Sequence, residues 1–380
     1  MSALKQAAAA ARTWLAEAGL PLWGTAGVDE TGAFHERLHF DGRPDLGADR
    51  RLRVQARQLY VFSEASVRGW WPGARQVADA GFEAFVRDCW ARDGKPGLLH
   101  VMGPDRSPLD LTRDAYDHAF GLFSLAWYYK ASRDPRALDL AHRMLDFLEA
   151  DMADRRHGGF LESLPPALPR RADPHMHMLE AMLEWTEADG DPRFLRMASD
   201  MVALFQRVLF DEQTGVLGEF FNADFTPETG AGGQVVSPGH HFEWAWLLAW
   251  AKRLGAGDAG DDGQRLYDFG VRHGLDSSGF AIDECDRQGR QTRRSRRAWP
   301  QTELIKAYLA QARAGDPGAA DAAAKVTMAF LGSYLATEVP GLWMDQFDEH
   351  GRGVTATAPA TTLYHVTVAF RELILFAEGA

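Results

Sequence analysis

Apolar residues recur at helical spacing from one end of the chain to the other. They fall at positions i, i+3, i+4 and i+7 of successive segments, which are separated by Gly, Pro and Asp. This spacing puts the apolar side chains on one face of a helix, whereas strand-like alternation is nearly absent. The pattern predicts about a dozen helices, at residues 4–18, 51–71, 74–92, 114–132, 135–150, 174–189, 192–210, 239–254, 261–273, 299–314, 318–337 and 361–378.

Three short joints between these segments resemble one another. Pro135, Pro192 and Pro317 each follow an Asp and stand where a new helix is expected to begin. Proline suits the first helical position, because the N–H that it lacks has no partner inside the helix there. The joints separate the second helix of one pair from the first helix of the next, so the chain is predicted to be a series of helix hairpins. Six such hairpins would close into a ring.

Every second predicted helix is richer in polar and aromatic residues than its neighbours. These helices carry the sequences RQLYVF, AYDHAFGLF, HMHMLEA, HHFEWAWLLAW, WPQTELIKAY and TLYHVTVAF, while the helices between them are plainer and more amphipathic. A helix that lines a central cavity is buried on most sides, and a helix of an outer ring buries one stripe only. The long polar connections at 19–50, 211–238 and 274–298 are too long to be simple links, and we expect loops or short hairpins over one mouth of the ring.

The charge of the chain narrows the choice of partner. A formal net charge of −12 and a pI near 5.5 argue against nucleic acid or an anionic membrane surface, since both need a positive face. The two cysteines, Cys89 and Cys285, are far apart and favour a reducing cytoplasm. No leader-like or membrane-spanning apolar run is expected, because Lys5, Gln6 and Arg12 interrupt the first alanine-rich segment. We expect a soluble cytoplasmic protein with a small-molecule partner; an oligomer is compatible with the sequence.

Two pairs of polar residues, each containing a histidine, lie inside the polar helices. His240 and Glu243 are three residues apart and share a helix face, so the carboxylate could fix the tautomer of the imidazole. Pro238 precedes His240 and places it in the first turn, where the helix dipole lowers the pKa of a cation and favours a neutral base. In the other pair, His175 and His177 are two residues apart and cannot both face one cavity. We favour His177, which shares a face with Glu180.

The sequence offers little support for a metal or a cofactor. The two histidines of HMHM diverge on a helix, and no HExxH is present. Motifs for a serine nucleophile, a phosphate-binding loop or a dinucleotide are also missing. The arginine run from Arg287 to Arg297 is expected to form a solvated loop that pairs with acidic neighbours. Alternatively, one or two of these arginines could bind an anionic group on a substrate. An aromatic face such as that of Trp299 suits the apolar face of a sugar ring.

Six of these motifs occur in the order typical of one family. RQLYVF, YDHAF, HMHMLEA, PGHHFEW, WPQTE and LYHV together resemble the N-acylglucosamine 2-epimerase superfamily, and YDHAF and WPQTE resemble its mannose isomerase-like branch, which includes sulfoquinovose isomerase. The resemblance implies an all-α fold, an (α/α)6 barrel of six helix hairpins that forms one catalytic domain over residues 1–380. It also implies the site. The catalytic residues would be Arg57, His177, His240, Glu243 and His365, and the substrate-binding residues would be Tyr116, His118, Trp299, Gln301 and Glu303.

The resemblance implies a cofactor-independent aldose–ketose isomerase that interconverts D-mannose, or a close aldose, and D-fructose through a cis-enediol. His365 would be the base at C1 and C2, while His240 with Glu243 would open the ring or act as a second acid/base group. Arg57 and His177 would donate hydrogen bonds to O1 and O2. One alternative is a 2-epimerase of the N-acylglucosamine or cellobiose type. Alternatives from other classes are a sugar-binding protein and an (α/α)6 glycoside hydrolase, which would need two carboxylates from among Asp117, Glu180, Glu243 and Glu303.

Overall fold

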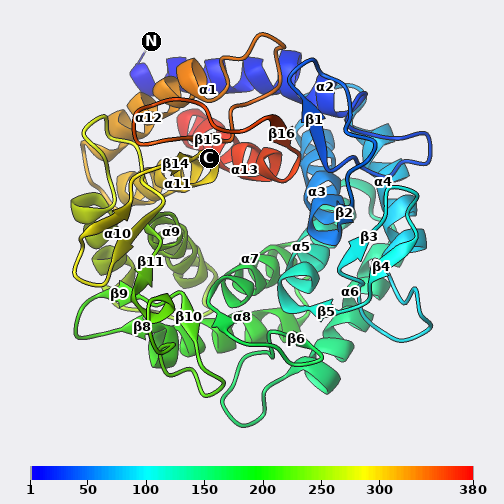
Figure 1. The fold of residues 1–380 in the computed structure, drawn as a ribbon, viewed down its shortest axis with the longest axis horizontal. Coiled ribbons are helices and arrows are strands. Elements are labelled where there is room, and N and C mark those ends of the chain that lie inside the picture. Colours follow the sequence, from blue (N-terminus) through cyan, green and yellow to red (C-terminus); the bar gives the residue numbers. More distant parts are fainter. Residues whose placement is uncertain (1, 380) are drawn as a thin grey trace.

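Two concentric rings of helices make up the protein (Figure 1). The computed structural model describes residues 2–379. In this part of the chain the inner ring has six helices, α3 (Leu52–Arg68), α5 (Ala115–Ser132), α7 (Asp173–Ala188), α9 (Pro238–Leu254), α11 (Ala298–Arg313) and α13 (Thr361–Glu378). The outer ring has α1 (Ala3–Trp14), α4 (Ala74–Asp88), α6 (Pro135–Phe147), α8 (Pro192–Leu204), α10 (Asp262–His273) and α12 (Ala319–Ser333), and the short α2 (Leu20–Trp23) follows α1. The predicted all-α (α/α)6 barrel is confirmed.

The two rings differ in burial as their sequences predict. In the inner helix α5 every residue from Asp117 to Tyr128 is buried, and in α13 every residue from Thr362 to Ile374 is buried. In the outer helix α6 only one stripe is buried, including Leu140, Ala141, Met144 and Leu145. An inner helix contacts both the outer ring and its inner neighbours, so it has no face left for bulk water. Polar side chains on inner helices must therefore find partners or face a cavity.

The Asp-Pro joints start two outer helices as expected. The side chains of Asp134 and Asp191 accept hydrogen bonds from the backbone N–H groups of Arg136 and Arg193, at 2.9 and 2.8 Å, which satisfies a donor left free at the helix start. The third joint differs from the prediction. Its Asp316 binds the N–H of Gly318 and α12 begins only at Ala319, so this proline lies in the turn rather than in the helix.

All six long connections run from an outer helix to the next inner helix, and they therefore meet at one mouth of the barrel. The expected hairpins over this mouth are present. Besides the three predicted connections, the structure has three more of the same kind, at 89–114, 153–172 and 334–360. Their strands have two or three residues each, too few for alternation to be recognised in the sequence. The strands are β1 (Arg37–His39), β2 (Arg50–Arg51), β3 (Val101–Met102), β4 (Pro108–Asp110), β5 (Arg113–Asp114), β6 (Ser163–Leu164), β7 (Arg170–Arg171), β8 (Phe210–Asp211), β9 (Val216–Leu217), β10 (Phe220–Phe221), β11 (Val235–Val236), β12 (Glu284–Asp286), β13 (Gln291–Arg293), β14 (Arg296–Arg297), β15 (Gln346–Phe347) and β16 (Thr357–Pro359).

These short strands pair around the mouth in a closed cycle. Each connection pairs with the next one, through β2–β3, β5–β6, β7–β10, β11–β12 and β14–β15, and all the pairs are antiparallel. The last connection returns to the first through β16 and β1. Because each pairing joins two neighbouring hairpins of the barrel, the six connections form one rim instead of six independent loops.

The ring of helices closes where the two ends of the chain meet. Helix α1 packs against α12 and α13, as Figure 1 shows at the top of the ring. The ring of Trp23 stacks on that of Trp343 with centroids 4.8 Å apart, and its Nε1 donates a hydrogen bond to the carbonyl of Gly341 at 2.9 Å. Within residues 2–379 no helix combines the length and apolar composition needed to cross a bilayer.

Candidate active site

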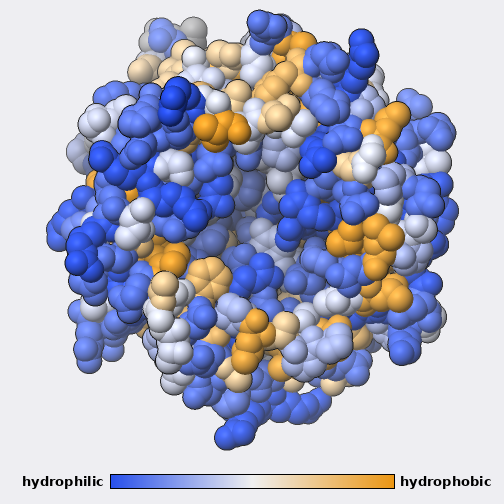
Figure 2. Space-filling view, in the orientation of Figure 1, coloured by the Kyte–Doolittle hydropathy of each residue, from blue (hydrophilic) through white to orange (hydrophobic). Residues whose placement is uncertain are grey.

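A cavity of about 580 Å³ opens at the mouth where the inner helices begin. Figure 2 shows it as a hollow near the centre of this face, with largely hydrophilic walls. The inner helices point their N-termini toward this mouth, and the positive ends of their dipoles favour negative charge there. The lining residues are Arg51, Arg53, Arg57, Tyr116, Asp173, His177, Glu219, Phe220, Val235, Ser237, His240, Glu243, Asp283, Glu284, Arg293, Arg297, Trp299, Asp345, Thr361, Thr362 and His365.

Seven of the residues predicted from the sequence line this cavity: Arg57, Tyr116, His177, His240, Glu243, Trp299 and His365. They come from all six inner helices, so the fold brings together positions up to 308 residues apart in the chain. Glu303 lies behind the wall and reaches the cavity only through His365. His118 and Gln301 do not line it.

His240 is held by a glutamate from a connection rather than by a residue of its own helix. Its Nδ1 lies 2.7 Å from Oε2 of Glu219, and Oε1 of the same carboxylate accepts a hydrogen bond from the N–H of Ser237. Burial by itself would lower the pKa of His240, but the Glu219 carboxylate outweighs burial and raises it to about 9. The prediction of a neutral His240 oriented by Glu243 is therefore wrong, because the connection before α9 brings a stronger partner than the helix face does.

His365 has the opposite electrostatic character. Its Nδ1 lies 2.9 Å from Oε1 of Glu303. Burial lowers its pKa well below the usual value, and the positive charges of Arg57 and Lys306 lower it further. Trp299 stands beside both histidines, with ring centroids 4.9 Å from His240 and 5.7 Å from His365. The cavity thus holds one protonated and one neutral imidazole at neutral pH.

Arg57 contributes a buried positive charge to the cavity wall. Its guanidinium donates hydrogen bonds to the hydroxyl oxygens of Tyr116, at 2.7 Å, and Thr361. It also lies over the ring of Phe120, with Cζ 4.0 Å from the centroid, which is the geometry of a cation–π contact. These partners are neutral, so they fix the guanidinium in place without cancelling its charge.

Three buried glutamates and a lysine lie at and beneath the floor of the cavity, and among them only Glu243 lines it. Nδ1 of His177 lies 3.0 Å from Oε2 of Glu180, as their shared helix face predicts. Burial lowers the pKa of His177 to about 4, so this ring is neutral. Burial and the neighbouring Glu303 carboxylate raise the pKa of Glu243 to about 8, so that its carboxyl group keeps its proton at neutral pH. Lys306 lies beside this group, with Nζ 3.7 Å from Oε1 of Glu243.

One group of cavity residues has the spacing of metal ligands. Donor atoms of His177, Glu180 and Glu243 lie within 4.8 Å of one another. Oε2 of Glu180 already accepts hydrogen bonds from His177 and from the hydroxyl of Tyr364. The ammonium group of Lys306 already supplies a positive charge beside Glu243. Oε1 of Glu180 and both carboxyl oxygens of Glu243 have no hydrogen-bond partner among the described residues, and the Lys306 ammonium group competes there with any bound cation.

His118 and Gln301, predicted to bind substrate, do not line the cavity and instead bind backbone groups of the preceding connections. Nε2 of His118 accepts a hydrogen bond from the N–H of Leu98, at 2.9 Å, and Oε1 of Gln301 accepts one from the N–H of Ala281, at 2.7 Å. His175 and His241 bind the N–H groups of Phe160 and Leu217 in the same way, and Gln55 binds that of Phe34. Each of these five side chains fastens the preceding connection to an inner helix, and we call them the clip residues. Their polarity satisfies buried backbone groups.

Glu219 was not among the predicted site residues, because it lies in a connection and not in one of the polar helices. An internal repeat could have revealed it. In each of the six connections a glycine with positive φ, at positions 32, 97, 159, 215, 279 and 341, comes three or four residues before a polar side chain. These side chains are Glu36, His100, Glu162, Glu219, Asp283 and Asp345. Four of them accept a hydrogen bond from a backbone N–H next to the following inner helix. Aligning the six copies points to Glu219.

The arginine run divides between the two roles considered for it. Arg287, Arg290 and Arg296 pair with Asp211, Asp286 and Asp276, as predicted, but of these three only Arg290 is solvated, because the side chains of Arg287 and Arg296 are largely buried. Arg293 and Arg297 line the cavity, where they pair with Glu284 and Asp283 at 2.8 and 3.1 Å. The loop thus supplies part of the rim.

A double ring of helices around one polar cavity, with two histidines whose pKa values are shifted in opposite directions, has the features of an α/α-barrel enzyme. The chain belongs to the N-acylglucosamine 2-epimerase (GlcNAc 2-epimerase) family, whose sequence model matches residues 32–369. The predicted family is confirmed, and with it the prediction that this protein is an isomerase or epimerase.

Three relatives illustrate the similarity. A mannose-6-phosphate isomerase of Rhizobium meliloti (strain 1021) is 35% identical over 374 residues, which are 95% of this chain and 95% of the relative. Two solved structures share the fold. A cellobiose 2-epimerase from Spirochaeta thermophila DSM 6192 superposes with a TM-score of 0.88 at 24% identity, covering 99% of this chain and 98% of the other. A D-mannose isomerase superposes with a TM-score of 0.84 at 18% identity, covering 98% and 97%.

Proposed function

We propose that this protein is a cofactor-independent aldose–ketose isomerase that interconverts D-mannose, or a close aldose, and D-fructose through a cis-enediol. The observation that carries the proposal is the pair His240 and His365, which line one cavity with pKa values driven in opposite directions. Such a pair supplies an acid and a base at the same pH. The mannose-6-phosphate isomerase relative, at 35% identity over nearly the whole chain, supports the sugar class.

Ring opening is the first step in this mechanism. The O1 hydroxyl of the closed sugar loses its proton to neutral His177, and the C1–O5 bond breaks as protonated His240 gives a proton to O5. Glu243 keeps its carboxyl proton up to a pH of about 8 and is a further hydrogen-bond donor at the floor. The product is the open-chain aldehyde, with His177 protonated and His240 neutral.

Proton transfer between C2 and C1 follows. Neutral His365 removes the C2 proton, while O1 receives a proton from His177 and becomes the hydroxyl of the enediol. Negative charge develops on the oxygens in this step, and the buried guanidinium of Arg57 stabilises it. His365 then returns its proton to C1, and the O2 proton passes to His240. Fructose results, and each of the three histidines regains its starting state.

A sugar 2-epimerase is the second candidate, and one observation favours it. His240 and His365 both line the cavity, and the ring of Trp299 lies beside each of them. If the two rings address opposite faces of the enediol, His240 could return a proton to C2 and invert that carbon. The cellobiose 2-epimerase of the same fold is a precedent for this outcome.

Turnover of D-mannose in D₂O, followed by proton and carbon NMR, tests the proposal. We expect fructose as the main product, with deuterium at C1 in the fraction where His365 exchanges its proton with solvent. Mannose 6-phosphate is run in parallel, because the R. meliloti relative carries that name. Accumulation of glucose labelled at C2, without ketose, would replace the isomerase by the epimerase. No turnover of either sugar or of other free aldoses would refute both.

A further inference from the structure

Lys306 lies directly beneath the candidate active site, and the mechanism above gives it no role. It belongs to α11, one turn after Glu303, and its side chain is fully buried. Its Nζ lies 2.5 Å from Oε2 of Glu303 and 4.0 Å from the ring centroid of Trp246. A buried ammonium group loses its proton unless partners hold the charge. Here burial lowers the pKa of Lys306, but Glu303, Glu243 and Glu180 more than compensate, and the net pKa is raised.

The two carboxylate oxygens of Glu303 connect this lysine to the base of the proposed reaction. Oε2 faces Lys306, and Oε1 faces Nδ1 of His365 at 2.9 Å. An ionised carboxylate only accepts hydrogen bonds, so His365 must carry its proton on Nδ1. The other nitrogen, Nε2, is then left with a free lone pair on the side of the ring away from Glu303, and His365 is one of the cavity-lining residues. This is the tautomer that a base at C2 requires.

The ionised state of Glu303 depends on Lys306. Glu303 is completely buried, and burial raises the pKa of its carboxyl group; the charge of Lys306 opposes that rise, although the net pKa stays above its usual value. We expect loss of the ammonium group to raise the pKa of Glu303 further and to favour its protonated form. A protonated carboxyl group can donate to Nδ1 of His365, which would move the imidazole proton to Nε2. The base would then have no lone pair toward the substrate.

We propose that Lys306 is a positioning residue that keeps Glu303 ionised, and that Glu303 thereby holds His365 in the tautomer with its Nε2 free. The effect on turnover rests on the proposed function, but the tautomer of His365 does not. The other groups that face His365 are Arg57 from α3, His177 from α7, His240 from α9 and Tyr364 from α13. Arg57 and burial disfavour an imidazolium at His365 whether or not Lys306 is present, so removing Lys306 is expected to switch the tautomer and leave the ring neutral.

The tautomer can be measured directly. In protein labelled with ¹⁵N at histidine, the signals of His365 are identified by their loss in His365→Asn. For the wild type near pH 7.5 we expect a protonated Nδ1 and an unprotonated Nε2. In Lys306→Met, which keeps the volume and removes the charge, we expect the two nitrogens to exchange roles. We also expect kcat to fall about 10²-fold, the usual scale for losing a positioned base, with KM nearly unchanged. Lys306→Arg retains a cation and should restore the wild-type shifts and most of the turnover.

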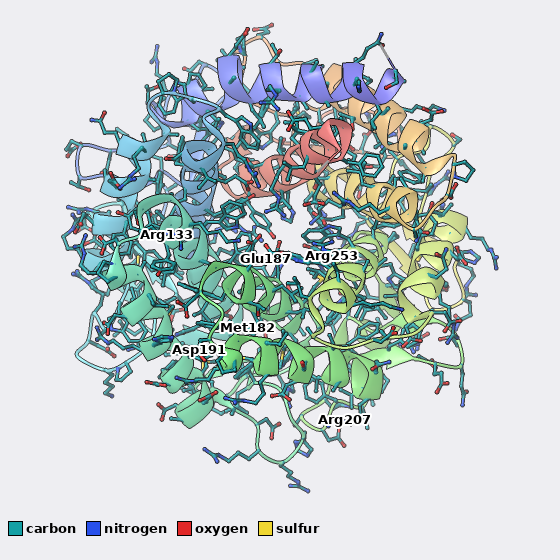
Figure 3. All side chains as sticks on the ribbon, turned by 180° about the vertical axis from the view of Figure 1, so that it is seen from behind. Arg133, Met182, Glu187, Asp191, Arg207 and Arg253 are labelled. Atoms are coloured by element: carbon teal, nitrogen blue, oxygen red, sulfur yellow. The ribbon has the colours of Figure 1, made fainter. Side chains whose placement is uncertain are left out.

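Lys130 offers a matched control at the opposite mouth of the barrel. Its ammonium group forms ion pairs with Glu184 and, at 3.6 Å, with Glu187. Figure 3 views this mouth, where Glu187 and Arg253 lie at the central opening. Lys130→Met also removes a largely buried charge, but far from His365. We expect it to lower the thermal stability and to leave both the His365 shifts and kcat as in the wild type.

A wild-type His365 with its proton on Nε2 overturns the proposal without any variant, and so does a folded Lys306→Met protein with wild-type shifts and turnover. If Lys306→Met does not fold, the wild-type shifts and the Lys306→Arg variant carry the test. If the wild type turns over no sugar, the proposed function fails, while the nitrogen shifts still report on the positioning role.

Discussion

His240 and His365 are the same kind of residue lining the same cavity, and their neighbours alone make one an acid and the other a base. Glu219 overcomes the effect of burial on the pKa of His240. Around His365, burial and the positive charges of Arg57 and Lys306 all lower the imidazole pKa. Glu303, the carboxylate partner of His365, forms an ion pair with Lys306. Glu219, the partner of His240, instead accepts a hydrogen bond from the backbone N–H of Ser237. Each histidine therefore takes its role from residues that do not react.

The alkaline limb of the pH profile follows from the pKa of His240. Its acid form exists below a pH of about 9, so kcat/KM for mannose should fall as the pH rises through that value. In Glu219→Gln the carboxylate is gone, and burial, opposed only by Asp173 and Glu243, lowers the imidazole pKa from about 9 toward its ordinary value of about 6.5 or below. We expect the limb to move about two units or more toward acid.

The matched control is Glu162→Gln, at the equivalent repeat position. Glu162 binds Arg171 instead of a histidine in the cavity, so the limb should stay near pH 9. A limb that does not move in Glu219→Gln would show that His240 is not the acid.

At the scale of elements, polar residues of the inner helices serve two purposes. The clip residues point back to the connections and satisfy backbone N–H groups, while positions on the cavity side supply the chemistry. His240 and His241 illustrate the division, because adjacent residues on a helix point in different directions. His240 lines the cavity, and Nε2 of His241 lies 3.3 Å from the N–H of Leu217.

Two alanine variants separate these purposes. His118→Ala leaves the buried N–H of Leu98 without its partner, and the expected cost is about 1–3 kcal/mol of stability, with kcat/KM near that of the wild type. His365→Ala should behave in the opposite way, with kcat lower by about 10²-fold or more and little loss of stability. Thermal unfolding and turnover are measured on both proteins. A large loss of turnover in a folded His118→Ala protein would return His118 to the active site.

At the scale of the molecule, the barrel is held as a closed ring at two levels. Neighbouring inner helices pack in sequence, and α13 packs against both α11 and α3. Above them the short strand pairs link the connections in a second cycle that β1 and β16 complete. The tryptophans Trp23 and Trp343 join the first and last hairpins beneath this rim.

Trp343→Ala tests the contribution of this closure. Trp343 is fully buried against Trp23, and truncating a buried aromatic side chain to alanine costs about 3–5 kcal/mol. Calorimetry should show a clearly lower unfolding temperature, and Trp343→Phe, which keeps an aromatic ring in the gap, should lose less. If Trp343→Ala unfolds at the wild-type temperature, the tryptophan pair does not hold the ring closed.

The sequence by itself determined the helices, their pairing and the identity of the inner ring. Those features depend on local spacing and on the burial of each helix, and both are written in neighbouring residues such as the AYDHAFGLF segment. The motifs also placed Arg57, His177, His240 and His365 on the inner ring. The partners of these residues were decided only by the tertiary structure. Glu219 reaches His240 across 21 residues of chain, and Glu303 reaches His365 across 62. Helical spacing carries no information about such contacts, so it paired His240 with Glu243 on the same helix and grouped His118 and Gln301 with the site. Packing, which fixes what each side chain faces, set the protonation states on which the chemistry depends.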